Sequence, residues 1–279
     1  MGQRVLPELV RYRAAADRQC EGEAQHDAAE FLRLLLGRMS AQELLAGRSV
    51  SWKVQSDVVQ ASHVDRLFGF VEETRWECKV CHSRRSQYGA GRILALPLPP
   101  VDERSRPCAA TDLYCRWAAA EEFALERAVV CEECGGWKTT HVRQRRVCTR
   151  PNILVCQVAR TDCANGDVLR HLVSPEEELS LPGVGSFELA GVVYHSGERL
   201  AGGHYICVSK GPDGLFWRFD DLTFRRSALD IGRLLMRQVY LLFYTRPGGT
   251  AVFEGMVEAP LLSGGAGRAG RGGAGVGHL

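Results

Sequence analysis

The amino-acid sequence predicts an α+β fold in which a helical segment precedes an antiparallel sheet. A broad apolar face recurs with helical spacing from Asp27 to about Ala46, and Gly47 supplies a stop signal. Four runs rich in β-branched and aromatic residues follow in the second half, at 153–158, 187–194, 205–209 and 239–244. We therefore expect a helix near the N-terminus and an antiparallel sheet built from the C-terminal half.

The composition limits the classes of function. Of the 279 residues, 45% are apolar and 24% are charged, as in an ordinary globular protein rather than a disordered or collagen-like chain. The formal net charge of +2 gives no reason to expect nucleic acid or an anionic membrane as a partner. No stretch approaches the roughly 18 uninterrupted apolar residues of a spanning helix, and the N-terminal residues lack a signal-peptide core. We expect no membrane partner and an intracellular location, in the cytoplasm, the nucleus or both.

Two pairs of cysteines stand out among the eleven in the chain, namely Cys78 with Cys81 and Cys131 with Cys134. Each pair has the Cys-x-x-Cys spacing that lets two thiolates point at one ion, and two such pairs supply the four sulfurs that Zn²⁺ prefers. The 49 residues between Cys81 and Cys131 exceed the gap of a compact zinc ribbon. On spacing alone the pairs are either one structural zinc site or unrelated reduced cysteines.

The stretch around the second cysteine pair predicts a helix and a strand. A proline-rich connection at 96–100 precedes a helical stretch around 111–127. From Lys138 to Arg150 the chain is basic without an acid, and we assign His141, Arg143 and Arg145 to the solvent-facing side of a strand. A zinc-stabilised nucleic-acid binder is the alternative that this segment supports, although nucleic acid is the less favoured partner.

A β-hairpin near the C-terminus brings a histidine close to two acids. Residues 202–210 and 215–221 form the predicted strands, and the turn lies at 211–214. If Lys210 faces Leu215, then His204 faces Asp221, and a slip of one residue places it opposite Asp220. Opposed residues share a face about 5 Å apart. The hairpin thus holds either a structural histidine or a general base whose tautomer a carboxylate fixes.

The C-terminal residues 249–279 form a glycine-rich tail. Eight of the last sixteen residues are glycine, and these sixteen contain no large apolar residue except Leu279. Such a segment cannot bury a core, so we expect the tail to be disordered.

Four segments resemble, in this order, motifs of the ubiquitin-specific proteases, a family of cysteine deubiquitinases. Residues 25–32 resemble the glutamine box, with His26 where a second glutamine is usual, and the cysteine pairs match the zinc-binding fingers. The histidine box and the closing strand are matched by residues 192–197, 202–205, 217–221 and 239–244. The match covers about residues 20–246.

The resemblance implies a papain-like right hand. A partial helical thumb would occupy residues 1–65, zinc-tipped fingers 66–150 and an antiparallel palm 151–248. The fingers would carry one structural Zn²⁺ on Cys78, Cys81, Cys131 and Cys134. The implied activity is thiol-dependent hydrolysis of (iso)peptide bonds at the C-terminus of ubiquitin, and the implied partners are ubiquitin or ubiquitinated proteins.

The resemblance also implies roles for single residues. His204 would be the general base, Asp220 the acid that orients it and Asp221 a neighbour able to share that role, whereas His195 is expected to pack. The substrate-binding residues would be Gln25, Asp27, Gly202, Gly203 and Tyr205. The two glycines suit this role because the absence of a Cβ lets a substrate backbone come close.

The family's nucleophile belongs to a cysteine box well upstream of the glutamine box. Only 24 residues precede Gln25, and they contain one cysteine, Cys20. Cys20 lacks the expected neighbours, and the adjacent Glu21 and Glu23 disfavour a thiolate. We therefore expect the chain to lack its nucleophile. It is then either an incomplete piece of an active enzyme or a non-catalytic relative that binds ubiquitin.

Overall fold

The structure, a computed structural model, describes residues 26–54, 57–99, 107–161, 168–199, 202–226 and 236–248. The elements of these ranges belong to one unit that extends to Pro247, and its mixture of helices and mostly antiparallel sheets confirms the predicted α+β class. Three predictions lie outside the described residues: the tail at 249–279, Gln25 and the setting of Cys20.

Helix α2 (Ala28–Leu45) forms where the sequence predicts it. Asp27 caps the helix, because its Oδ1 accepts a hydrogen bond of 2.8 Å from the backbone N–H of Glu30. After the C-terminal end, Gly47 adopts a φ of 69°, which glycine tolerates at no steric cost. The hairpin of β1 (Val50–Val54) and β2 (Asp57–Ala61) then leads to α3 (His63–Phe68). None of the described helices is long and apolar enough to cross a membrane.

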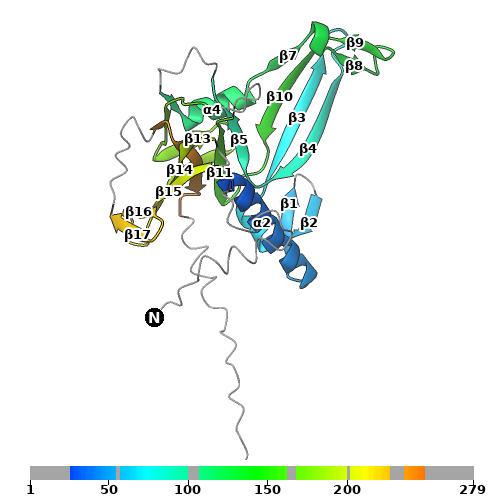
Figure 1. Cartoon of the computed structure of the whole chain (residues 1–279). Coiled ribbons are helices and arrows are strands. Elements are labelled where there is room, and N and C mark those ends of the chain that lie inside the picture. Colours follow the sequence, from blue (N-terminus) through cyan, green and yellow to red (C-terminus); the bar gives the residue numbers. More distant parts are fainter. Residues whose placement is uncertain are drawn as a thin grey trace, which may run out of the picture. The chain divides into compact units, whose positions relative to one another are not determined.

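The largest sheet, which we call the palm sheet, contains the strands predicted in the second half (Figure 1). Its order is β17 (Thr223–Arg226), β16 (Phe216–Asp220), β15 (Gly202–Lys210), β14 (Gly185–Arg199), β18 (Val239–Thr245), β11 (Ile153–Ala159) and β5 (Leu94–Pro97), and β13 (Glu178–Leu181) also pairs with β14. All these neighbours are antiparallel except β5 and β11. The strand β5 comes from the segment between the cysteine pairs, so not all of 66–150 belongs to the fingers.

Both faces of the palm sheet are covered by helices. Helix α4 (Ala110–Ala118) buries Leu113 and Trp117 in a large core that includes Leu154 and Leu242 of the sheet. Helix α2 contributes Ala29 to a smaller cluster with Tyr240 and Leu241. Near α4, β6 (Cys108–Ala109) pairs in parallel with β12 (Val173–Ser174). The sheet is thus held mainly by apolar burial, which is favourable by about 25 cal/mol per Å² removed from water.

The predicted helix around 111–127 is too long. Helix α4 ends at Ala118, and the chain continues as β7 (Glu121–Phe123) and a short 3₁₀ turn, η2 (Leu125–Arg127). The segment forms a strand rather than a helix because β7 pairs with β10 and because the Phe123 ring packs on Trp76, with ring centroids 4.9 Å apart. A tertiary contact therefore overrides the local helical pattern.

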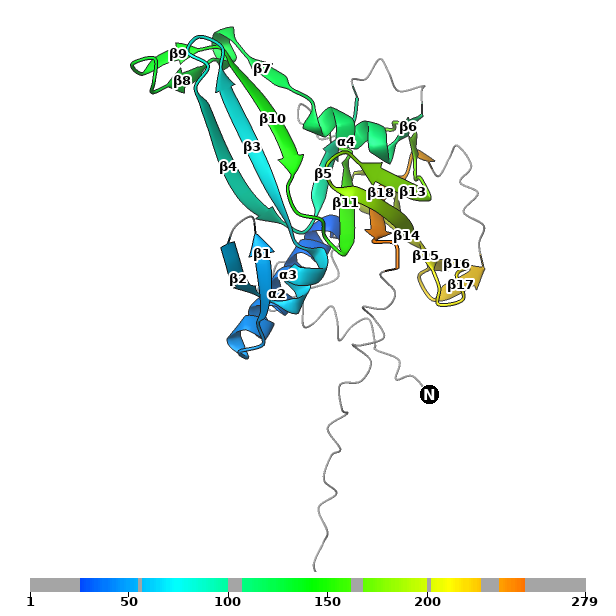
Figure 2. The same cartoon turned by 180° about the vertical axis from the view of Figure 1, so that it is seen from behind.

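A second sheet, which we call the finger sheet, has the order β4 (Arg84–Gly91), β3 (Phe70–Cys78), β10 (His141–Val147) and β7. Figures 1 and 2 show β3, β4 and β10 running side by side, with the hairpin of β8 (Val129–Cys131) and β9 (Trp137–Thr139) at their end. We call this end, which carries both cysteine pairs, the finger tip.

The solvent-facing side of β10 is the opposite of the one predicted. Gln144 and Arg146 are exposed, whereas Arg143 and Arg145 are half-buried. The guanidinium of Arg143 lies 4.9 Å from the Phe123 ring centroid, and that of Arg145 lies 5.0 Å from the Trp117 ring centroid. Arginine stems and planar heads pack well on aromatic rings, so charge alone did not identify the exposed face.

Candidate active site and metal centre

The palm hairpin joins His204 of β15 to Asp220 at the end of β16. The Nε2 atom of His204 lies 2.6 Å from Oδ1 of Asp220, and the two side chains are 44% and 31% exposed. The carboxylate accepts the Nε2–H bond, so in the neutral ring the proton sits on Nε2 and Nδ1 is left for proton transfer. This is the arrangement that a general base and its orienting acid require.

The strand register differs from both predicted alternatives. Lys210 faces Phe216 rather than Leu215, and continuing this register places Asp220 opposite Ile206. Asp220 therefore reaches His204 as a diagonal neighbour, two residues away on the same face. The turn is one residue longer than predicted because Leu215 is drawn into it: its carbonyl accepts a hydrogen bond from the Gly211 N–H at 2.7 Å.

Asp220 has a second partner that fixes its other oxygen. The Nη2 of Arg218 donates to Oδ2 at 2.9 Å. The hydrogen bond to His204 and then that to Arg218 lower the pKa of Asp220 below its usual value, so the carboxylate stays ionised. Asp221 is exposed, with a φ of 49°, and forms a cluster with His204 and Asp220 in which one donor atom of each lies within 4.8 Å of the others. The hydrogen bond itself is made by Asp220, and the shared role of Asp221 stays a prediction.

Contacts within the chain explain why glycine precedes His204. Gly203 has a φ of 138°, and a Cβ built on it would lie 2.4 Å from the backbone oxygen of Ser196. Gly202 offers its carbonyl oxygen to Nε2 of His195 at 3.2 Å. His195 is only 2% exposed, and its ring centroid is 4.7 Å from that of Tyr205, so the expected packing role is confirmed. The predicted close approach of a substrate to both glycines stays a prediction.

Asp27 and Tyr205 take part in docking α2 on the palm sheet. The Tyr240 hydroxyl donates to Oδ2 of Asp27 at 2.5 Å and accepts a bond of 2.8 Å from Nε2 of Gln157. The N–H of Ala28 donates to the Tyr205 hydroxyl at 3.4 Å, and burial raises the pKa of Tyr205 to about 12. Both oxygens of Asp27 are thus engaged within the chain, and the substrate-binding roles of Asp27 and Tyr205 stay predictions.

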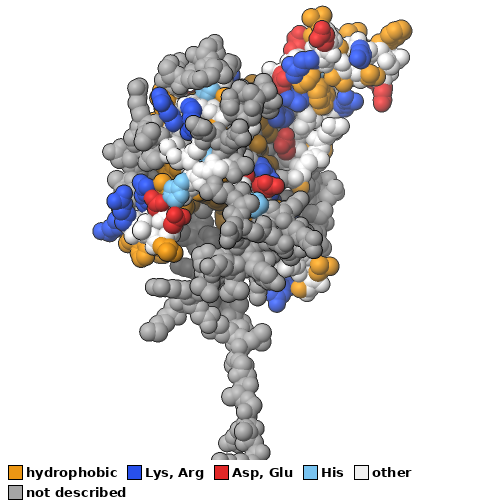
Figure 3. All heavy atoms as spheres, in the orientation of Figure 1, with side chains coloured by type: hydrophobic (Ala, Val, Ile, Leu, Met, Phe, Trp, Pro, Cys, Tyr) orange, Lys and Arg blue, Asp and Glu red, His pale blue; other side chains and the backbone are white. Residues whose placement is uncertain are grey.

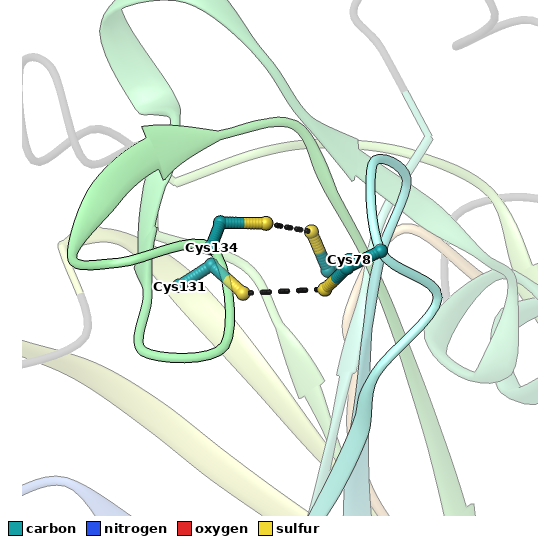
Figure 4. Close-up of side chains that lie close together, drawn as sticks. Cys78, Cys131 and Cys134 are labelled. Carbon is teal, nitrogen blue, oxygen red and sulfur yellow. Dashed lines mark hydrogen bonds between the residues drawn. The ribbon is translucent and has the colours of Figure 1, made fainter.

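The four predicted ligands meet at the finger tip. The Sγ atoms of Cys78, Cys81, Cys131 and Cys134 all lie within 4.8 Å of one another. The distance is 3.8 Å from Cys78 to Cys134 and 3.6 Å from Cys81 to Cys131, and Figure 4 shows the sulfurs facing one another. A tetrahedron with Zn–S bonds of about 2.3 Å has sulfur–sulfur edges of about 3.8 Å. The donor set and its spacing therefore fit one metal ion.

Local backbone geometry and nearby hydroxyls support the cluster. Cys78 and Cys131 end their strands, whereas Cys81 and Cys134 lie in the turns that follow. The hydroxyl oxygens of Thr139 and Ser83 lie 3.3 Å from Sγ of Cys78 and 3.2 Å from Sγ of Cys81. Hydroxyl groups that contact ligating sulfurs in this way help to hold them in place. His82, which follows Cys81 directly in the sequence, has its Nδ1 3.8 Å from a carboxylate oxygen of Glu77.

No thiol among the described residues lies within hydrogen-bond distance of His204. Cys156 is buried, and its pKa is raised to about 12 by that burial. Cys207 is half-buried, and this burial also raises its pKa. The assignment of the nucleophile therefore stays a prediction.

Comparison with known proteins places this chain in a family. The sequence profile described as ubiquitin carboxyl-terminal hydrolase matches residues 4–244. The chain belongs to this family. The predicted resemblance to ubiquitin-specific proteases is thereby confirmed.

Relatives and solved structures agree with this placement. The probable ubiquitin carboxyl-terminal hydrolase 16 of Schizosaccharomyces pombe is 27% identical over 231 residues, covering 80% of this chain and 48% of the relative. Ubiquitin carboxyl-terminal hydrolase 17-like protein A of Mus musculus is 27% identical over 234 residues, covering 80% and 41%. A chain of the SAGA deubiquitinating module Ubp8/Sgf11/Sus1/Sgf73 bound to monoubiquitin has a TM-score of 0.65 at 21% identity, covering 85% of this chain and 52% of that chain, which confirms the fold. This chain spans about half the length of these relatives.

Proposed function

We propose that the chain is a ubiquitin-specific protease domain that serves thiol-dependent hydrolysis of (iso)peptide bonds at the C-terminus of ubiquitin. The observation that carries this proposal is the 2.6 Å pair of His204 and Asp220 in a chain of this family. Ubiquitin as the partner is supported by the related module, which was solved with monoubiquitin bound. We expect the partners to be ubiquitin and ubiquitinated proteins.

In this proposal each group has a step in the reaction. Nδ1 of His204 would take the proton of a cysteine thiol, and Asp220 would stabilise the resulting imidazolium while Arg218 holds its second oxygen. The thiolate attacks the carbonyl carbon of the bond, and the imidazolium returns the proton to the leaving amine. Water then hydrolyses the thioester with the same histidine as base.

A second candidate function applies if the chain has no nucleophile. No thiol among the described residues lies within hydrogen-bond distance of His204, so no attacking cysteine is assigned. The alternative is therefore a non-catalytic ubiquitin-binding protein or scaffold that keeps the fold. Losing a nucleophile costs several orders of magnitude in rate, so the two functions are easily separated.

The metal at the finger tip is, in this proposal, a structural Zn²⁺. Four thiols in a tetrahedral arrangement form a closed site, which is typical of structural rather than catalytic zinc. Every described cysteine is free of disulfides, which supports an intracellular, reducing location. The packing of Arg143 and Arg145 on aromatic rings supports the lower rank given to nucleic acid.

The first experiment uses the 279-residue chain without any added segment. We expect it to bind ubiquitin in a calorimetric titration and to form no covalent adduct with ubiquitin that carries a C-terminal thiol-reactive group. An adduct that disappears in Cys20→Ala would show that the chain supplies its own nucleophile. No binding at millimolar ubiquitin would overturn the proposed function.

The second experiment joins an upstream cysteine box to the chain and follows turnover of a fluorogenic ubiquitin C-terminal amide. We expect His204→Ala to lose activity by about 10³-fold or more, because no other described group of the motif can take the proton. Asp220→Ala should lose less, and Asp221→Ala is the matched control for its neighbour and should lose least. Full activity of His204→Ala would refute the assignment of the base.

A further inference from the structure

Strands β14 and β15 approach each other unusually closely just before His204. A Cβ on Gly197 would lie 2.4 Å from the backbone oxygen of Gly202, and a Cβ on Gly203 would lie 2.4 Å from that of Ser196. The pairing is regular from Gly191 to Ser196 and then shifts between Ser196 and Arg199. The residue opposite Ser196 is His204, so the irregularity begins directly beside the proposed base.

The imidazole of His195 lies against this close approach. A Cβ on Gly203 would be 2.8 Å from Nε2 of His195, and one on Gly197 would be 3.1 Å from its Cε1. The Nε2–H donates to the Gly202 oxygen at 3.2 Å, and Nδ1 has no hydrogen-bond partner among the described residues. Burial lowers the pKa of His195, which keeps the ring neutral and its single proton on Nε2.

Two tyrosines fix the orientation of this ring. The ring centroids of Tyr205 and Tyr240 lie 4.7 Å and 6.2 Å from that of His195. Tyr240 is itself held by Asp27, and Tyr205 by Ala28 of α2. The imidazole of His195 therefore has a fixed position from which its N–H can hold a flexible glycine backbone.

We propose that His195 is a positioning residue: by donating to the Gly202 carbonyl it holds the irregular start of β15, and it thereby aims His204 at Asp220. The inference rests on the proposed function of His204 as the base. Register irregularities of this kind often re-aim a side chain beside an active site.

The physical need for such a support comes from the glycines. Gly202 and Gly203 have no side chains to pack, and Gly203 has a φ that L side chains rarely adopt. Without a bond to the Gly202 carbonyl, this backbone has more conformations to choose from. Because a displacement of about 1 Å at a reacting group can cost about 100-fold in rate, a loose start of β15 would matter.

Arg170 supports the other strand of the same irregular region. Its Nη2 donates to the backbone oxygen of Gly197. His195 and Arg170 thus each bond to a backbone oxygen of one of the two strands in the irregular region. Of these two bonds, the one from His195 acts on the strand that carries His204, so we place the positioning role there.

The test separates the hydrogen bond from the packing of the ring. His195→Gln keeps an N–H donor of similar reach, whereas His195→Phe keeps a ring of similar size without any donor. The readout is the ¹⁵N shift of the two ring nitrogens of His204, assigned with His204→Ala, which reports where the ring proton sits. Thermal unfolding of each variant is measured in parallel.

We expect at least a tenfold preference for the Nε2–H tautomer of His204 in the native chain and in His195→Gln, since a charge-assisted bond to Asp220 favours it by about that factor or more. In His195→Phe the preference should fall severalfold. If the phenylalanine overpacks and the variant does not fold, His195→Leu, which is smaller and also lacks a donor, takes its place. In the enzyme with a joined cysteine box, the donor-free variant should lose about 100-fold in kcat.

Three outcomes would overturn the proposal. An unchanged tautomer preference in the donor-free variant would show that the bond positions nothing. An equal loss of tautomer preference in His195→Gln would show that the N–H donor does not position His204. If both donor-free variants unfold while His195→Gln stays folded, the hydrogen bond stabilises the fold as a whole rather than positioning His204. The tautomer measurement needs no ubiquitin, so a failed ubiquitin titration would sink the proposed function and leave this result standing.

Discussion

The palm sheet and the finger tip are stabilised in different ways within one chain. The palm buries a continuous set of apolar side chains against α4. The finger tip leaves apolar side chains exposed, including Trp137 at 74% and Val80 at 66%, as the orange spheres at that end of Figure 3 show. A metal ion held by its four cysteines would supply the cohesion that these exposed side chains do not. This difference predicts that loss of the metal unfolds the finger tip and leaves the palm sheet folded. A cavity in the core should destabilise the palm sheet without releasing the metal.

The largest effect is expected for Cys131→Ser. Loss of one of four thiolates should reduce bound zinc from one per chain to well under one, since the closed site depends on all four ligands. Amide hydrogen exchange should then rise in β8 and β9, while β11 and β18 stay protected. The matched control is Cys115→Ser, an exposed cysteine on α4. Full zinc content in the Cys131 variant would contradict the assignment of Cys131 as a zinc ligand at the finger tip.

The palm should respond to a cavity instead. Leu154 is completely buried, so Leu154→Ala should lower the free energy of unfolding by about 2–5 kcal/mol, measured from urea midpoints. Zinc content should not change in the folded protein. Leu125→Ala, at a site that is 90% exposed, is the control and should stay within about 0.5 kcal/mol of the native chain.

A smaller effect is expected where α2 docks on the palm. Tyr240→Phe removes the hydroxyl that joins Asp27 to Gln157, so Oδ2 of Asp27 and Nε2 of Gln157 lose this hydrogen bond in a partly buried setting. The cost should be about 1–3 kcal/mol of unfolding free energy. Tyr88→Phe is the control, because its hydroxyl bond to Glu73 is longer, at 3.3 Å, and its side chain is exposed. Equal losses in the two variants would mean that the α2 contact is no stronger than a surface bond.

The smallest effect concerns pH and the finger sheet. Burial raises the pKa of Glu73, but hydrogen bonds from Ser86 and Arg146 outweigh it and hold the pKa below its usual value. The ionised carboxylate therefore stabilises the fold above the unfolded pKa of about 4.3, and this contribution is lost as the pH falls through the lower folded pKa. Glu73→Gln should cost about 1 kcal/mol at pH 6 and less at pH 3. The measurement is the urea midpoint at both pH values, with the exposed Glu188→Gln as control; a cost independent of pH would contradict the assignment.

The sequence predicted the elements whose residue types give a clear local signal. Helix α2 and the strands β11, β14, β15 and β18 formed where expected, because each is an apolar helical pattern or a run of β-branched and aromatic residues. The cysteine quartet was predicted because ligand spacing is local within each pair. These features depend on residues close together in the chain, and that is the information a single sequence carries best.

What the sequence missed depends on distant partners. Helix α4 ended early because Phe123 finds Trp76 on another strand, and the face of β10 was inverted because its arginines stack on Phe123 and Trp117. The hairpin register was displaced because Leu215 bonds across the turn to Gly211. The prediction of Asp220 as the partner of His204 still held, because Asp220 reaches His204 as a diagonal neighbour in the displaced register. The role of His195 had no sequence signal beyond its place in the motif.

The position of β5 has a consequence for the order of folding. The chain runs outward through β3, returns through β4 to the edge of the palm at β5, and only then runs outward again to β8 and β9. Each excursion makes half of the metal site by itself, Cys78 with Cys81 and then Cys131 with Cys134. A metal ion held by the first half-site shortens the search for the second, because closing so long a loop is the slow, entropically costly step. Zinc would then act on the rate of assembly as well as on the finished fold, as a nucleus that the chain acquires from solution.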